Sequence, residues 1–316
     1  MKICALFGIL LFAATRLLAG ERATVVVVVG APGEDEYATV FTQQIEAWKK
    51  VTTQAGAKPI VIGAEPAGTA TDRDQLKQQL DAEPKDGAGE VWLVLIGHGT
   101  FDGKEAKFNL RGLDLTATDL AEWLKPFKRP LALVATASAS APFLVKLAAP
   151  GRVVVSATRS GNEQNYARFG KYFAEAIADA KSDLDKDGQV SLLEAFLSGS
   201  QRTAEFYKTE GRLATEHALL DDNGDGLGTP ADWFRGVRAT KRARDGASLD
   251  GIRAHQFHLV RSPAEQQLSE EARARRDALE LKIAKLRDAK AKLTEAKYFE
   301  ELEKLLLELA AVYEGT

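Results

Sequence analysis

The stretches LVLIGHG at residues 93–99 and LALVATASAS at residues 131–140 are apolar runs that stop abruptly at small and polar residues. Such runs are typical of parallel strands that are buried on both faces and reach the surface at their carboxyl ends. Ligands of parallel α/β sheets bind outside that edge. The first run delivers His98 and Gly99 to the edge and the second delivers Ser138, so a histidine and a hydroxyl are candidates for a catalytic pair.

Short apolar segments alternate with amphipathic ones over the first two thirds of the chain. The expected strands lie at 23–30, 59–63, 90–97, 131–135 and 152–158. The expected helices lie at 35–55, 71–83, around 120–124, near 143–147 and at 166–180. This alternation predicts an α/β fold, a three-layer sandwich with a mostly parallel sheet.

The length of 316 residues accommodates one large domain with an appendage, or two modest domains. Lys2, an apolar stretch over 3–14 and small residues at Ala19 and Gly20 are typical of a secretory signal peptide. We therefore assign 1–22 to a signal peptide and expect a secreted or periplasmic protein. The net charge of −3 gives no reason to expect nucleic acid as a partner, and no stretch is long enough for stable membrane insertion.

The single cysteine, Cys4, lies inside the predicted signal peptide. The mature chain would then contain no cysteine. Its absence excludes disulfides, thiolate metal sites and cysteine nucleophiles from the mature protein.

Residues 183–194 (DLDKDGQVSLLE) match the twelve-residue calcium loop of an EF-hand. Gly188 supplies the sharp turn at position six. The alternative is an acidic turn that caps a helix. The expected calcium ligands are Asp183, Asp185, Asp187, the Gln189 carbonyl and Glu194.

Residues 221–232 (DDNGDGLGTPAD) repeat this pattern more weakly, because Asp232 replaces the terminal glutamate and Pro230 precedes it. The ligands that fit are Asp221, Asn223 and Asp225. The alternative is a tight turn rich in aspartate and asparagine. We expect at least one of the two loops to bind Ca²⁺.

The C-terminal part of the chain loses the strand and helix alternation. Residues 23–235 form the predicted α/β domain with its EF-hand-like loops, and 236–262 form a linker with a lone strand at 254–260. His255 and His258 in that segment are predicted to be packing or surface residues. Two apolar stripes in 263–316 predict an antiparallel helical hairpin or coiled coil, which either docks on the domain or forms a homo-oligomer.

A hydrophobic strand ending in His-Gly, followed by a strand ending in a small-residue run, resembles the caspase and legumain (C13-type, clan CD) peptidases. The resemblance covers roughly residues 24–207. It implies that His98 corresponds to the catalytic histidine and that Ser138 stands where these peptidases have the catalytic cysteine. It also implies that the strand over 152–158 helps to line a substrate pocket. The chain departs from the family at Ser138 and at Ala141, which replaces a glycine.

The serine at the cysteine position decides which chemistry is open to the chain. A thiol is partly ionised near neutral pH, whereas a serine hydroxyl needs a base in direct hydrogen-bond contact. One hypothesis is a catalytically silent, caspase/legumain-like domain that binds a peptide or protein. A second is an active hydrolase that uses Ser138 with His98, with the Gly99 N–H in the oxyanion hole. A third is a secreted interaction protein that works through its C-terminal helices.

Overall fold

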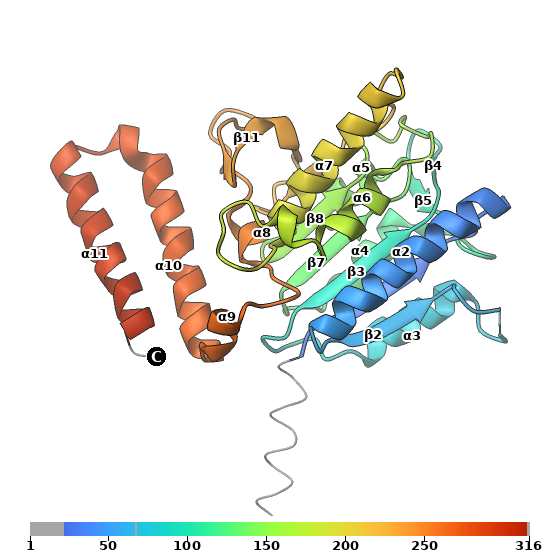
Figure 1. The fold of residues 1–316 in the computed structure, drawn as a ribbon, viewed down its shortest axis with the longest axis horizontal. Coiled ribbons are helices and arrows are strands. Elements are labelled where there is room, and N and C mark those ends of the chain that lie inside the picture. The colour runs from blue at the N-terminus through green and yellow to red at the C-terminus, as the bar shows by residue number, and fades with distance from the viewer. Residues whose placement is uncertain (1–21, 67, 315–316) are drawn as a thin grey trace, which may run out of the picture.

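The computed structural model describes residues 22–66 and 68–314 (Figure 1). Except for Arg22, the predicted signal peptide at 1–22 lies outside the described residues. Within the described ranges, no helix combines the length and the apolar character needed to cross a membrane.

A mixed sheet with the strand order β10-β9-β8-β7-β3-β1-β2 lies at the centre of the described chain. Its parallel strands are β1 (Thr24–Val29), β2 (Lys58–Ile62), β3 (Val91–Ile96), β7 (Leu131–Ala135) and β8 (Arg152–Ser156). Two short antiparallel strands extend the β8 edge, namely β9 (Leu219–Asp221) and β10 (Thr229–Pro230). Every residue of β1, β3 and β7 is buried, as the continuous apolar runs predicted.

Helices cover both faces of this sheet (Figure 1). Buried side chains of one face pack against α2 (Asp35–Gln54), α6 (Phe169–Ala176) and α7 (Leu192–Thr209). The other face packs against α3 (Asp72–Ala82), α4 (Ala117–Leu124) and α5 (Ala141–Leu147). The predicted three-layer α/β architecture with a mostly parallel sheet is therefore confirmed.

A small antiparallel sheet lies against the carboxyl ends of the central strands. Its strands are β4 (Gly99–Phe101), β5 (Ala106–Phe108) and β6 (Leu115–Thr116). A Cβ atom at Gly30 would lie 2.4 Å from the backbone oxygen of Asn109, and one at Gly97 would lie 3.0 Å from the Phe108 ring. The glycines that follow β1 and β3 are therefore needed for this close approach of two layers.

The segment after the second acidic loop differs from the prediction. The strands β11 (Phe234–Arg235) and β12 (Arg238–Ala239) form a short hairpin. The lone strand predicted at 254–260 is wrong, because the chain there forms the short helix α8 (Ile252–Gln256). Ala254 and Phe257 are three residues apart and both are buried in the core, a spacing that a helical turn satisfies. A short segment with a few apolar residues does not distinguish a strand from a helical turn.

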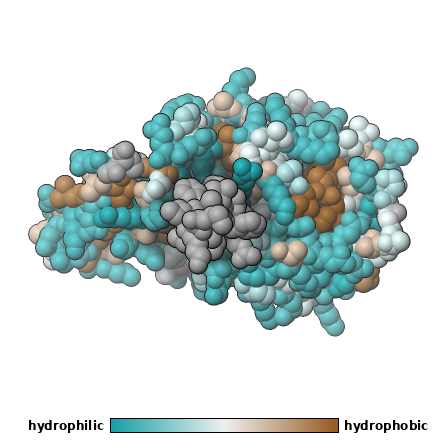
Figure 2. Space-filling model, turned by 90° about the horizontal axis from the view of Figure 1, so that it is seen from below, coloured by the Kyte–Doolittle hydropathy of each residue, from teal (hydrophilic) through white to brown (hydrophobic). Residues whose placement is uncertain are grey.

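The C-terminal residues form a helical hairpin beside the α/β domain (Figure 1). It consists of α9 (Pro263–Gln267), α10 (Glu270–Ala289) and α11 (Glu295–Glu314), with the 3-10 turn η3 (Lys290–Lys292) between the two long helices. The apolar stripe of α10 is buried. On α11, Phe299, Leu306 and Leu307 remain 45% to 65% exposed, and apolar residues reach the hairpin surface in Figure 2. A homo-oligomer through these helices stays a prediction.

Candidate functional site

His98 and Ser138 follow the carboxyl ends of adjacent strands, because β3 pairs with β7 and Leu95 lies opposite Ala135. The main-chain turn after β7 approaches Gly99 so closely that a Cβ atom there would lie 2.2 Å from the Ser138 oxygen. The sheet therefore brings the two predicted strand ends together.

The Ser138 hydroxyl is bonded to the backbone of Gly99 in both directions. Its oxygen accepts a hydrogen bond from the Gly99 N–H at 3.1 Å, and the hydroxyl donates to the Gly99 carbonyl at 3.2 Å. Only 3% of Ser138 is exposed. The Gly99 N–H, which was expected to form an oxyanion hole, therefore already donates its hydrogen bond to the Ser138 hydroxyl, the expected nucleophile.

His98 has different neighbours from Ser138. Its Nε2 atom lies 3.1 Å from the Pro32 carbonyl oxygen. Because that oxygen can only accept, the contact requires the ring proton on Nε2 and leaves Nδ1 as the basic nitrogen. Within the described ranges, no hydrogen bond joins the His98 ring to Ser138 or to a carboxylate.

Asp102 was the nearest carboxylate in sequence to His98, and the structure places it in a turn. Its side chain accepts hydrogen bonds from the backbone amides of Glu105 and Lys104, both at 2.9 Å. These two bonds hold the pKa of the exposed Asp102 carboxyl below its usual value. These two hydrogen bonds explain the position of the Asp102 side chain, and no contact with His98 is needed for it.

The other hydroxyls after β7 also satisfy backbone groups. Thr136 donates to the Leu95 carbonyl at 2.7 Å, and Ser140 accepts from the Ala157 N–H at 3.0 Å. A buried strand end leaves backbone donors and acceptors that must be paired. The run of small hydroxyl residues therefore has a structural reason at this edge.

An aromatic cluster lies around His98. The ring centroids of Tyr37, Phe41 and Tyr166 lie 4.6, 5.4 and 5.8 Å from that of His98. His98, Tyr37 and Tyr166 are half-buried, so each retains surface that a ligand can contact. Sequence analysis did not single out the two tyrosines, because they come from α2 and from the segment before α6.

The first acidic loop has the backbone of an ion-binding loop. The Asp183 carboxylate accepts hydrogen bonds from the amides of Lys186 at 2.7 Å and Gly188 at 3.2 Å. Lys186 and Gly188 have φ of 66° and 88°, so the loop bends back at positions four and six. One carboxylate oxygen from each of Asp183, Asp185 and Asp187 lies within 4.8 Å of the other two. Three predicted calcium ligands are thus brought together.

The remaining predicted ligands of this loop already have protein partners. Glu194 is fully buried and its carboxylate accepts from the amides of Leu184 at 2.7 Å and Ser191 at 2.8 Å. The Gln189 side chain donates to the Asp187 carboxylate at 3.0 Å, whereas the ligand predicted from Gln189 is its main-chain carbonyl. The entering helix is also shorter than predicted, since α6 ends at Ala176 and a 3-10 turn, η1 (Ala180–Ser182), precedes the loop.

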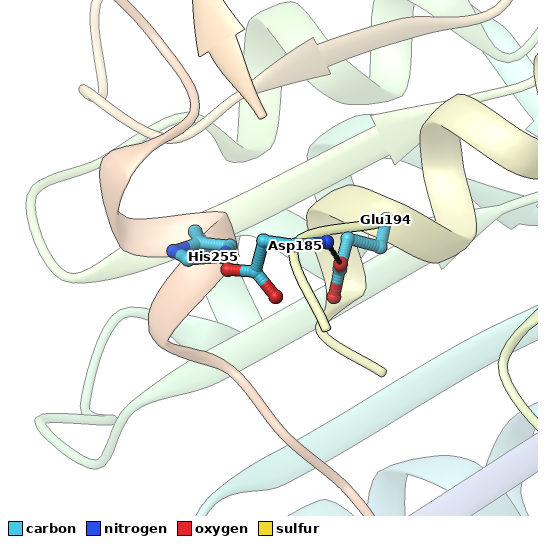
Figure 3. Close-up of side chains that lie close together, drawn as sticks. All are labelled: Asp185, Glu194 and His255. Atoms are coloured by element: carbon cyan, nitrogen blue, oxygen red, sulfur yellow. Dashed lines mark hydrogen bonds and ion pairs between the residues drawn. The ribbon is translucent and has the colours of Figure 1, made fainter. Parts of the chain in front are cut away.

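His255 adds a nitrogen to the first loop, which sequence analysis missed. Its Nε2 lies 3.0 Å from an Asp185 carboxylate oxygen, and Figure 3 shows Asp185 between His255 and Glu194. Ligand atoms of Asp185, Glu194 and His255 lie within 4.8 Å of one another. The two residues of the Asp185–His255 contact are 70 positions apart, so no local spacing could have shown it.

The second acidic loop repeats the hydrogen bonds of the first. The Asp221 carboxylate accepts from the amides of Gly224 at 3.0 Å and Gly226 at 2.7 Å, again at positions four and six. Both glycines have positive φ, 81° and 73°. Asn223 accepts from the Asp225 amide at 2.8 Å, as the third residue of the first loop does from the fifth. The weaker sequence copy thus adopts the same conformation.

Asp250, which sequence analysis missed, lies on this loop, whereas Asp232 is exposed in the 3-10 turn η2 (Ala231–Trp233). Asp250 accepts from the Asp222 amide at 3.0 Å and is 3% exposed. Burial, followed by the nearby Asp222 carboxylate, raises the pKa of Asp250 to about 7. Burial likewise raises the pKa of Asp221 to about 6. Within the described residues, the carboxylates of Asp221, Asp222 and Asp250 form no ion pair with a lysine or arginine.

Comparisons with known proteins gave matches among solved structures alone. No family model and no curated protein matches the chain. The Drosophila initiator caspase Dronc is similar with a TM-score of 0.40 and 9% sequence identity, over 66% of this chain and 82% of that chain. Caspase-1 from Spodoptera frugiperda is similar with a TM-score of 0.40 and 11% identity, over 65% of this chain and 87% of that chain.

Proposed function

We propose that the chain is a secreted, caspase/legumain-like peptidase homologue that binds a peptide or protein and does not hydrolyse it. The observation that carries the proposal is the double hydrogen bond between the Ser138 hydroxyl and the Gly99 backbone. A serine nucleophile needs a base that takes its proton, and the Ser138 proton points at a carbonyl oxygen instead. An attacking Ser138 would have to break both bonds and leave a position that is 3% exposed.

The same edge retains a surface suited to an extended peptide. His98, Tyr37 and Tyr166 are half-buried rings at the carboxyl ends of the strands. Aromatic side chains that combine an apolar face with a polar tip are frequent anchors of binding surfaces. Loss of the nucleophile removes the reaction and leaves this contact surface in place.

We expect no labelling of Ser138 by a fluorophosphonate probe, because its hydroxyl has no base in contact. The measurement is in-gel fluorescence of the full mature chain, with Ser138→Ala as the site variant. Ser160→Ala, which follows β8 at the same edge, is the control for unspecific serine labelling. Removing the Ser138 hydroxyl leaves the Gly99 amide and carbonyl unpaired, so we expect the variant to lose about 1–3 kcal/mol of stability.

A different labelling pattern would support the hydrolase. Labelling that disappears in both Ser138→Ala and His98→Ala, but persists in Ser160→Ala, would overturn the silent domain. In that case the hydroxyl must leave Gly99 in solution and reach the histidine. Retained peptide binding in Ser138→Ala, together with absent labelling of the parent chain, is the outcome that the proposal requires.

We propose further that the two acidic loops bind Ca²⁺ as a resident cofactor. Carboxylate and carbonyl oxygens are the ligands that Ca²⁺ prefers, and both loops carry the same backbone bends at positions four and six. Asp183, Asp185 and Asp187 would hold the first ion, and Asp221, Asn223 and Asp225 the second. Bound calcium would neutralise carboxylates that, among the described residues, form no ion pair with a lysine or arginine, and would strengthen the link between the first loop, before α7, and the segment that carries α8, which His255 already makes with Asp185.

We expect Ca²⁺ to raise the melting temperature of chelator-treated protein. At a free concentration of about 100 times its dissociation constant, the ion adds about 2.7 kcal/mol of stability, or roughly 4 °C for a chain of this size. The double variant Asp183→Asn/Asp187→Asn should lose the shift of the first loop, and Asp221→Asn that of the second.

Asp86→Asn, an exposed aspartate paired with Lys128 on the surface, is the matched control and should keep both shifts. Isothermal titration calorimetry gives the number of ions directly. Neither heat of binding nor a change in melting temperature on adding Ca²⁺ to the parent chain would contradict the calcium assignment.

A further inference from the structure

A cleft lies between the α/β domain and the C-terminal hairpin, beside the second acidic loop, whose Asn223 is among its lining residues. It consists of two adjoining cavities with volumes of about 500 and 530 Å³. Arg238, Leu249 and Arg287 line both cavities, so the two lie side by side. The walls come from the β11–β12 hairpin, the loop that follows it, α8 and α10.

The rim of this cleft is strongly basic. Six cationic side chains line it, namely Arg235, Arg238, Arg242, Arg253, Lys285 and Arg287. Arg242 pairs with Asp288 at 3.2 Å. Within the described residues, the other five form no ion pair and no side-chain hydrogen bond. A concentration of unpaired cations in a chain of net charge −3 marks a surface that is built to attract an anion.

Apart from Asp288, which pairs with Arg242, the carboxylates of the cleft form no ion pair with the rim cations among the described residues. Asp222 and Asp250 are 6% and 3% exposed. Asp222 accepts a hydrogen bond from the Ala254 amide at 2.8 Å, and Asp250 accepts one from the Thr229 hydroxyl at 2.6 Å. Both side chains are turned to protein partners below the rim, while Arg235, Arg238 and Arg287 are exposed.

The floor of the cleft is apolar and contains no large ring. Among the described residues, its apolar lining includes Val237, Leu249, Ile252, Leu281 and Ala284; it contains no phenylalanine, tyrosine or tryptophan, and His255 supplies the one ring. Single-stranded nucleic acids are bound by stacking successive bases on aromatic rings, a series that this surface lacks. An apolar floor with separated cations around it fits a segment that carries both acidic and apolar groups.

We propose that this cleft binds an acidic peptide segment, with its carboxylates paired to the rim arginines and its apolar side chains on the floor. Arginine favours such contacts because its planar guanidinium binds a carboxylate through two parallel hydrogen bonds. The cations come from four separate elements, which spreads the charge along the cleft as an extended segment requires. This site is separate from the edge at His98 and Ser138.

Fluorescence anisotropy of the full mature chain with a labelled peptide tests the assignment. The probe is a peptide of about 12 residues that alternates glutamate with leucine, and its analogue carries glutamine at every glutamate. We expect the glutamate peptide to bind at least about tenfold more tightly than the glutamine analogue, and to weaken as sodium chloride rises from about 50 to about 500 mM.

The double variant Arg238→Gln/Arg287→Gln should weaken binding of the glutamate peptide by at least about tenfold. Arg275→Gln is the matched control, since Arg275 is exposed on the same helix as Arg287 but lines neither cavity. Equal affinities of the double variant and the control would overturn the proposal, as would failure of the parent chain to bind. Displacement of the peptide by inorganic phosphate at equal charge would contradict the peptide assignment and would indicate a site for small anions instead.

Two results separate this site from the proposed function. His98→Ala should leave binding of the glutamate peptide unchanged, because His98 lies at the opposite, carboxyl end of the parallel strands. Labelling of Ser138 by fluorophosphonate would contradict the proposal that the domain is catalytically silent. It would not affect the proposal that the cleft binds an acidic peptide. Loss of peptide binding in His98→Ala, in a variant whose melting temperature is unchanged, would place the peptide at the strand edge and overturn the cleft assignment.

Discussion

Gly99→Ala is expected to destabilise the protein by about 3 kcal/mol, which lowers the melting temperature by roughly 5 °C. The added Cβ atom would lie 2.2 Å from the Ser138 carbonyl oxygen and 3.2 Å from the Lys107 carbonyl oxygen. Both are backbone atoms, and β4 holds Gly99 opposite Phe108. Neither strand end can move aside without breaking its sheet.

The control for this substitution is Gly68→Ala. A Cβ atom at Gly68 meets nothing within 4 Å. We expect a change of no more than about 0.5 kcal/mol there. Denaturant unfolding of the two variants and the parent measures the difference. A Gly99→Ala protein as stable as the parent would show that the two strand ends do not approach as described. The hydrogen bonds between Ser138 and Gly99 would then also be wrong.

His258 is expected to make stability fall as the solution becomes acidic. Its side chain is buried and its Nε2 atom has no hydrogen-bond partner among the described residues. Burial is the largest effect and lowers the pKa of His258 to about 4. Asp187 and Glu265 oppose that shift, while His255 and Arg276 add to it.

The sign follows from the protons that each state binds. Between the pKa of about 4 in the folded state and the ordinary value near 6.5, the unfolded chain binds a proton at His258 and the folded chain does not. Lowering the pH through this window therefore favours unfolding. From about pH 7 to about pH 5, the contribution amounts to about 2 kcal/mol.

His258→Gln removes this proton and isolates its effect from that of the carboxylates. The free energy of unfolding is measured with denaturant at both pH values, in chelator so that calcium does not contribute. We expect the fall in stability between them to be about 2 kcal/mol smaller in the variant than in the parent. The same fall in both proteins would mean that His258 is protonated, or exposed, in the folded state.

The alternation of apolar runs and amphipathic segments was sufficient to predict the layers of this protein. Strands such as β1 and β7 consist of consecutive apolar residues, and such runs are stable when both faces are covered. The acidic loops were also predictable, because their bends depend on contacts between residues two to five positions apart. Local spacing carries that information in full.

The sequence-based prediction was wrong where a local pattern was compatible with both a strand and a helix. Residues 254–260 are apolar enough for a short strand, yet α8 covers the first of them, and Ala254 and Phe257, three residues apart, both pack in the core. The exposed leucines of α11 show what a helical pattern does not predict. A helical stripe predicts an apolar face but not what covers that face.

The three-layer sheet was therefore predictable from residue order alone, as were the two polar strand ends at one edge and the bends of the two acidic loops. The hydrogen bonds of Ser138 to the Gly99 backbone, and the positions of Asp250 and His255 beside those loops, become visible in the folded chain. The fold alone assembled the basic cleft from four elements. The reason is physical: hydrogen bonds and ion pairs act over a few ångströms in space, and the residues that form these sites are tens of positions apart along the chain.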